Sequence, residues 1–298
     1  EDLDAEMHVR STGYDTDEAE RLARASHLVF DEAGSLLIIE GKFPVEGRQT
    51  PTLRLKVPRR LAIRIDEKGS PAEIRNVASV VIGSGRSVTK IADVPGMVNV
   101  TQRGSEVTIV DVGTVKLSTI TGVEAVVSRV RGDASFTLQG GELRAESIAG
   151  AIDVEARNAE VQFDRLGETR GPIRINATLG EVVMNGLAAD TRIDGRRSEI
   201  RIDHAGGAPL SVYNEGDETI EITVPSRGFT LDAAAVDGDV SVDESLASLG
   251  LKRETSGNGE TEGDRPARQE VRVSGAVHGG GPPITLRATR GDIVVRGR

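Results

Sequence analysis

The side chains of this sequence that could do chemistry are carboxylates, arginines and histidines, because the chain of 298 residues contains no cysteine. Arg192, Glu199 and Arg201 occupy positions that could share one outer face of a sheet, and Asp203 follows them. Enzymes that cleave polysaccharides need two carboxylates at a set separation, or a base beside a charge-neutralising cation. A carbohydrate-active enzyme is therefore one alternative. Alternating outward charges are also typical of any solvated sheet, so we assign no catalytic residue.

Asp237, Asp239 and Asp243 could contribute to a calcium site, because hard cations bind several carboxylate or carbonyl oxygens. The sequence has no EF-hand loop and no Gly-Gly-x-Gly-x-Asp array, which favours solvated acids in turns. His204 follows a predicted strand and is expected at the surface. The histidines are far apart and lack the spacing of zinc ligands, so we expect no metal and no cofactor: His8, His27, His204 and His278.

Two tripeptides spell the sequence that integrins recognise, Arg131-Gly132-Asp133 and Arg290-Gly291-Asp292. The same Gly-Asp pair recurs without an arginine at Gly238-Asp239. Glycine and aspartate are common turn residues. The pattern therefore indicates a turn of a structural repeat rather than a recognition motif.

The elements that must position these residues are short strands that recur along the chain. Pairs of the form apolar-x-apolar, which place both side chains on one face of a strand, run from Val98/Val100 to Val240/Val242 in steps that are mostly 9 or 10 residues. A sandwich with antiparallel hairpins would need unequal loops. The constant step favours an all-β solenoid of about nine coils, with two strands per coil and residues 18 to 20 apart stacked.

Composition agrees with a repetitive aliphatic core and excludes several functions. Only 2% of the residues are aromatic, which argues against a site that stacks sugar rings or bases. The net charge of -10 argues against a general nucleic-acid binder. No apolar run approaches the roughly 18 residues of a membrane span.

Two segments depart from the repeat. We expect residues 1–50 to form an N-terminal segment that caps the solenoid, with a short helix at 19–25 behind Asp15-Thr16-Asp17-Glu18. Strands are expected at 36–40, 53–57 and 61–65. The solenoid is expected over 51–298, interrupted near 249–269 by a mobile polar insertion, because the repeat resumes at Val271/Val273.

The end of the chain, from Gly279-Gly280-Gly281-Pro282-Pro283-Ile284 to Arg290-Gly291-Asp292-Ile293-Val294-Val295, resembles the close of an adhesin-type family of bacterial envelope proteins related to the toast-rack domains. Leu53-Arg54-Leu55-Lys56-Val57-Pro58 resembles the strand before their repeats, and the similarity covers about 50–298. The resemblance implies a right-handed single-stranded β-solenoid, an extracytoplasmic location and a non-enzymatic role. It carries over no catalytic residue.

These observations together predict a non-catalytic, adhesin-like interaction or scaffold module of the bacterial cell envelope, periplasmic or at the cell surface. The expected partner is an envelope glycan or an envelope protein. The sequence opens at Glu1 in polar sequence, so we expect a mature or truncated chain whose membrane anchor, if it has one, lies outside it. A sensory domain of an envelope-stress system is the alternative, with the carbohydrate-active enzyme as the second alternative.

Overall fold

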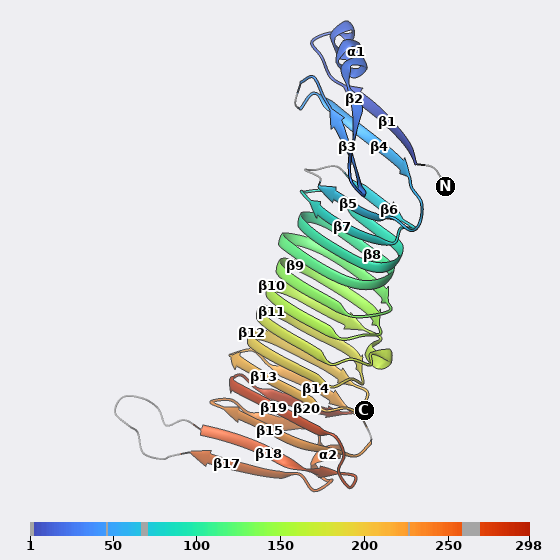
Figure 1. Cartoon of the computed structure of the whole chain (residues 1–298). Coiled ribbons are helices and arrows are strands. Elements are labelled where there is room, and N and C mark those ends of the chain that lie inside the picture. Colours follow the sequence, from blue (N-terminus) through green and yellow to red (C-terminus); the bar gives the residue numbers. More distant parts are fainter. Residues whose placement is uncertain (1–2, 46, 67–70, 226, 258–268) are drawn as a thin grey trace. The chain divides into compact units, whose positions relative to one another are not determined.

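The computed structural model describes residues 3–45, 47–66, 71–225, 227–257 and 269–298. The chain forms two compact units, Glu1–Leu61 and Ala62–Arg298 (Figure 1). The second unit begins later than residue 51, because the strand predicted at 53–57 pairs within the first unit. Whether the first unit caps the solenoid stays a prediction.

The first unit consists of two antiparallel ribbons and one helix. Strand β1 (Asp4–Ser11) pairs with β4 (Gln49–Lys56), and β2 (His27–Ala33) pairs with β3 (Leu36–Lys42). Helix α1 (Thr16–Ala25) confirms the predicted helix and begins earlier. Its N-cap is Asp15, whose Oδ1 accepts a hydrogen bond from the Glu18 N–H at 2.7 Å.

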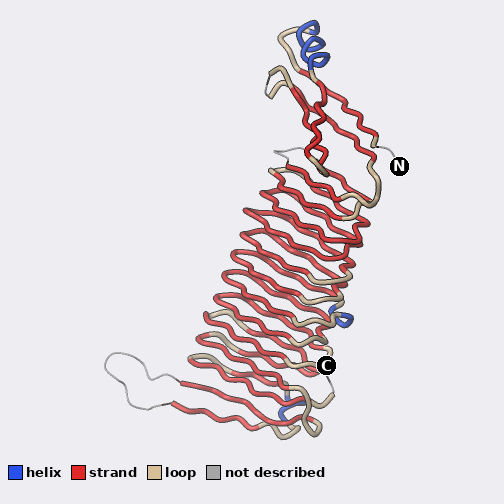
Figure 2. Tube along the Cα trace, in the orientation of Figure 1, coloured by secondary structure: helices blue, strands red, loops and turns tan. Residues whose placement is uncertain are grey.

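The second unit is a β-solenoid of about eight turns, as the sequence predicts. Figure 2 shows its strands following one another around the coils, with short turns between them. The first five strands are β5 (Ala62–Asp66), β6 (Ala72–Arg75), β7 (Ser79–Ser84), β8 (Thr89–Val130) and β9 (Ala134–Ile148). Then come β10 (Ile152–Asp164), the 3-10 turn η1 (Leu166–Glu168), β11 (Ile173–Leu187), β12 (Thr191–His204), β13 (Leu210–Gly216) and β14 (Ile220–Val224). The chain ends with β15 (Phe229–Val236), β16 (Val240–Val242), α2 (Glu244–Ala247), β17 (Lys252–Gly257), β18 (Gln269–Val277), β19 (Pro283–Arg290) and β20 (Ile293–Gly297).

Successive coils stack in parallel with the predicted separation. Ala134 pairs with Ile152, Ile152 with Ile173, Ile173 with Thr191 and Thr191 with Leu210, which are separations of 18, 21, 18 and 19 residues. Each apolar-x-apolar pair therefore continues a column of side chains that points into the coil. The columns are almost fully buried, and Phe136 and Phe163 lie inside with ring centroids 6.1 Å apart.

The coils bend at corners where single residues adopt the left-handed conformation. One such series is Asp93, Asp111, Arg129, Ser147 and Arg165, in which each φ lies between 54° and 57°. The members are 18 residues apart, so one corner is repeated in five successive coils. The long strands β8 to β12 arise because the ladder of hydrogen bonds continues around such corners.

Chain order is broken at the last coil. Strand β19 lies between β13 and β15, and β20 lies between β14 and β16. The last coil in the sequence is therefore an interior layer of the stack. Figure 1 shows β19 and β20, coloured red, between strands coloured orange.

The end of the stack is closed by an antiparallel pair. Strand β18 pairs with β15 on one side and with β17 on the other. The predicted insertion at 249–269 is therefore wrong at its beginning, because residues 252–257 form strand β17. Every residue of β17 is exposed and shows no alternation, so its strand conformation depends on pairing with β18. Residues 258–268 of the predicted insertion lie outside the described residues.

In the parts of the chain that the structure describes, no helix has the length and apolar character needed to cross a bilayer.

Candidate functional site

Glutamates from five neighbouring coils lie in register on one outer face of the solenoid. Glu124 pairs with Glu142, Glu142 with Glu160, Glu160 with Glu181 and Glu181 with Glu199. Each glutamate directly precedes a buried residue that points into the coil, and strand residues alternate between faces, so each glutamate points outward. Neighbouring parallel strands are about 4.8 Å apart. We call these five residues the glutamate ladder.

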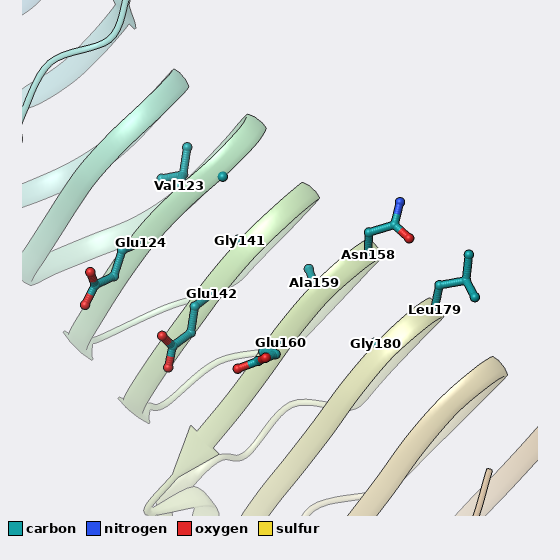
Figure 3. A pocket seen from close by; sticks show the side chains of 10 residues that line it. Val123, Glu124, Gly141, Glu142, Asn158, Ala159, Glu160, Leu179 and Gly180 are labelled. Carbon is teal, nitrogen blue, oxygen red and sulfur yellow. The ribbon is translucent and has the colours of Figure 1, made fainter.

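A groove of about 540 Å³ runs beside the first three rungs. Figure 3 shows Glu124, Glu142 and Glu160 on one side of a row of small residues, with Asn158 and Leu179 on the other side. The row consists of Val123, Gly141, Ala159 and Gly180.

The glycines of the groove are required by the close approach of the coils. A Cβ atom at Gly141 would lie 2.2 Å from the carbonyl oxygen of Val123, and one at Gly180 would lie 2.1 Å from that of Ala159. Real Cβ atoms do not approach backbone oxygens so closely. The coils can stack at this corner, and the groove can keep its floor, only without side chains there.

The rungs of the ladder differ in how their charge is balanced. Glu142 Oε1 lies 2.6 Å from Arg144 Nε, and Arg201 forms ion pairs with both Glu181 and Glu199. Glu124 and Glu160 are exposed and have no ion pair or side-chain hydrogen bond to any described residue. The groove therefore presents carboxylates that can accept hydrogen bonds from, or pair with, a cationic group.

Unbalanced charges in register work against the stability of the fold. The two rungs without partners, Glu124 and Glu160, are two layers or about 10 Å apart, so they repel each other by about 0.4 kcal/mol in a water-like dielectric. A cationic group placed between them would remove this repulsion. The ladder is thus suited to binding a partner with repeated positive charges.

The residues of the enzyme hypothesis do not form one cluster. Strand β12 bends at Arg197, which has φ of 51°. Arg192 lies before this bend and pairs with Asp194 at 2.8 Å, whereas Glu199 and Arg201 lie after it. Asp203 is bound to Arg298. The predicted common face is therefore wrong for Arg192, and the charged groups that remain are engaged in ion pairs.

The acids of the calcium hypothesis hold the fold together. Asp237 accepts a hydrogen bond from the Gln269 N–H at 3.3 Å, and Asp243 accepts one from the Gly297 N–H at 2.9 Å. Asp239 pairs with Arg253. Across the described ranges, no group of three or more His, Asp or Glu could hold a metal ion.

The two integrin-like tripeptides are turns of the repeat. Asp133 Oδ1 accepts the N–H of Ala151 in the next coil at 2.8 Å, and Asp292 Oδ1 accepts the N–H of Asp239 at 2.8 Å. The carboxylate of each aspartate thus links neighbouring coils by accepting a hydrogen bond from a backbone N–H, which agrees with the structural interpretation of Gly-Asp.

The surface position predicted for His204 is wrong. His204 pairs with Leu187 of the preceding coil and is 2% exposed. Its Nδ1 accepts the Gly206 N–H at 2.8 Å, so the proton is on Nε2, which donates to the Ala208 carbonyl at 3.1 Å. Burial lowers the pKa of His204, and the hydrogen bond to Ala208 opposes this only in part. The ring acts as a neutral core residue that closes the turn after β12.

The sequence contains a signal for the ladder that a search for catalytic or metal motifs does not detect. The five glutamates are 18, 18, 21 and 18 residues apart, the same steps as the inward columns, and each stands immediately before an inward residue. Of the five glutamates, only Glu199 belongs to the residues of the enzyme hypothesis, together with Arg192 and Arg201.

The fold and this surface define the class of the molecule, a β-solenoid with repetitive outer faces. Comparison with protein-family models, with curated proteins and with solved structures finds no match to this chain.

Proposed function

We infer that the chain is a non-catalytic interaction module of the bacterial cell envelope, adhesin-like, which acts outside the cytoplasm. The observation that carries this proposal is the glutamate ladder beside its groove, where Glu124 and Glu160 stand without partners. The ladder is a linear surface, and a linear surface suits a linear partner. The resemblance of the repeat to envelope proteins supports the location.

The partner that fits this surface is an envelope glycan or an envelope protein that presents positive charges at intervals. Amino groups of a partly deacetylated glycan, or basic side chains of an extended protein segment, would meet the unpaired carboxylates of Glu124 and Glu160, which are two layers or about 10 Å apart. Binding of this kind weakens as salt increases, because exposed charges are screened.

The first test is co-sedimentation of the purified chain with peptidoglycan and with whole envelope fractions, before and after protease treatment of the envelopes. Retention that survives protease and is lost at high salt supports a glycan partner. Retention that is lost on protease treatment indicates a protein partner and favours the sensory alternative. No retention in any fraction overturns the proposal.

The second test asks whether the ladder makes the contact. The double variant Glu124→Gln/Glu160→Gln removes two unpaired charges and is expected to lose most of the retention. The matched control is Asp153→Asn/Glu155→Gln, which makes the same change of charge at exposed positions of β10 before its bend. Equal loss in both variants would show that net charge, and not the ladder, governs binding.

A further inference from the structure

The last segment of the chain fills a gap between two coils that are consecutive in the sequence. We call residues 283–298, which contain β19 and β20, the C-terminal coil. On one side it pairs with β13 and β14, and on the other with β15 and β16. Strand β14 ends at Val224 and β15 begins at Phe229, so the two coils flanking the gap follow each other directly along the chain.

The gap fits the C-terminal coil closely. Ile284, Leu286, Ile293 and Val295 are at most 1% exposed and continue the inward columns. Ile284, for example, lies between Leu210 and Leu231. Without the coil, the gap would present two unpaired strand edges and uncovered apolar columns, which favours pairing with another strand of the same pattern.

Polar contacts also hold the C-terminal coil in place. Arg287 forms an ion pair with Asp232 and donates to the Asp232 carbonyl at 2.8 Å. Arg298 forms an ion pair with Asp203. Both sets of contacts are made by the coil with the body of the solenoid, so a coil from any copy of the chain can make them equally well.

The connection to the coil is a short hinge, residues 278–282, that crosses the start of β15. His278, Gly279 and Gly280 have φ of 49°, 84° and 85°. The hinge passes over Gly228, where a Cβ would lie 2.4 Å from the Gly280 carbonyl. A left-handed conformation is unfavourable for histidine, and Pro282 and Pro283 favour extended backbone. An extended hinge would release His278 from the left-handed conformation and would remove the close approach to Gly228.

We propose that the C-terminal coil exchanges between two copies of the chain, each copy inserting its coil into the gap of the other, to form a swapped dimer. Every strand pairing and every ion pair of the C-terminal coil is kept in this dimer, and only the hinge changes conformation. The gap stays open until residues 283–298 have been synthesised, because these residues follow both flanking coils in the chain. A second copy with its own open gap is therefore a competent partner during folding.

Engineered disulfides test this directly, because the chain contains no cysteine. Ser211 and Thr285 are paired across the boundary between the body and the C-terminal coil, and both alternate outward. The variant Ser211→Cys/Thr285→Cys is refolded at high concentration, oxidised and run on a non-reducing denaturing gel. Exchange gives a covalent dimer. A covalent monomer alone, with the dimer band absent, overturns the proposal.

A matched pair inside the body controls for chance oxidation. Ser135 and Asp153 are paired in neighbouring coils that do not exchange, so Ser135→Cys/Asp153→Cys is expected to give only a covalent monomer. A second variant lengthens the hinge with Gly-Ser residues after Gly280, which lets the coil close on its own body. Loss of most of the covalent dimer is expected on adding this insertion to the first pair. An unchanged dimer fraction would contradict the hinge argument.

Discussion

The two units of this protein use strands in opposite ways. In the solenoid, strands such as β9 to β12 are stacked between neighbours and turn alternate side chains into a closed interior. Among the described residues of the first unit, by contrast, the buried apolar side chains are Leu22 and Pro58 alone. Where the structure describes the chain, the exposed large apolar side chains belong to the first unit, except Met97, Leu179 and Tyr213.

Strand pairing alone therefore does not make a hydrophobic core. An isolated two-stranded ribbon leaves both faces in water and is marginally stable. Phe30 of β2 is 50% exposed although it is fully paired with β3. Phe163 of β10 is not exposed at all, because the coil closes around it. Stability in this chain therefore comes from closure of the coil, and substitutions can test that statement.

The largest effect is expected for Phe163→Ala. Removing a fully buried phenylalanine leaves a cavity, and such changes cost about 3 to 5 kcal/mol. The same change at Phe30 in the first unit is expected to alter the free energy of unfolding by less than about 0.5 kcal/mol. Urea denaturation followed by circular dichroism measures both. Similar losses in the free energy of unfolding of the two variants would contradict the statement that stability comes from closure of the coil.

A smaller effect is expected for Gly180→Ala. The new Cβ collides with the Ala159 carbonyl, and overpacking of this kind costs about 1 to 3 kcal/mol. The control is Gly34→Ala in the turn of the first ribbon, where φ is 66° and no atom lies within 4 Å of the new Cβ. There only the backbone conformation opposes the change, at about 1 to 2 kcal/mol. Thermal unfolding compares the two, and a groove ligand should also bind the Gly180 variant less well.

His204 is expected to make the solenoid sensitive to mild acid. The unfolded chain takes up a proton near the ordinary histidine pKa of 6.5, whereas burial lowers the pKa in the folded state. Unfolding therefore takes up a proton below pH 6.5, so the free energy of unfolding is full above that pH and falls as the pH decreases through it. His204→Gln should flatten this dependence between pH 7 and 5. Parallel curves for the two proteins would contradict the assignment.

The smallest effect is expected when the ladder loses charge. Glu124→Gln/Glu160→Gln should raise the free energy of unfolding by about 0.4 kcal/mol at most at low salt, because the repulsion between these two unpaired rungs, which are two layers apart, is relieved. The gain should shrink at high salt. Glu142→Gln should give no gain, since Glu142 is already paired with Arg144. A stable variant that no longer binds envelope fractions would separate the function of the ladder from the fold.

Much of the fold could be predicted from the sequence because one constraint recurs in every coil. Pairs such as Ile152/Val154 and Ile173/Ile175 must face inward, so the spacing of apolar residues reports the length of a coil directly. The helix behind Asp15 could be predicted for a similar local reason, since the cap is made by adjacent residues.

The position of the C-terminal coil could not be predicted in this way. Its inward residues have the same apolar character as those of every other coil, so Ile284 fits beside Leu210 as well as Leu231 would. Periodicity specifies which face a residue takes, but it does not specify which coil is the neighbour. Strand β17 escaped prediction because its conformation depends on its partner.

The glutamate ladder and the burial of His204 needed the register between coils. His204 reads as a polar residue after a strand, yet it occupies the place that Leu187 fills one coil earlier. Each of the five glutamates alone is an ordinary residue of an acidic chain. They form a continuous row of carboxylates only because the coils stack in register. Properties shared across coils are therefore the part of this molecule that a linear search for motifs misses.

The uniform register has a consequence for how such a molecule can change in size. Removing residues 134–151 would join Asp133 to Ile152, which already occupies the place of Ala134 one layer further along. All inward columns would continue, and the ladder would lose one rung, Glu142, and about 4.8 Å of length. The length of the solenoid body can therefore change by the addition or deletion of whole coils. The length of the surface that contacts a partner can change in this way while the chemistry of each remaining rung stays the same.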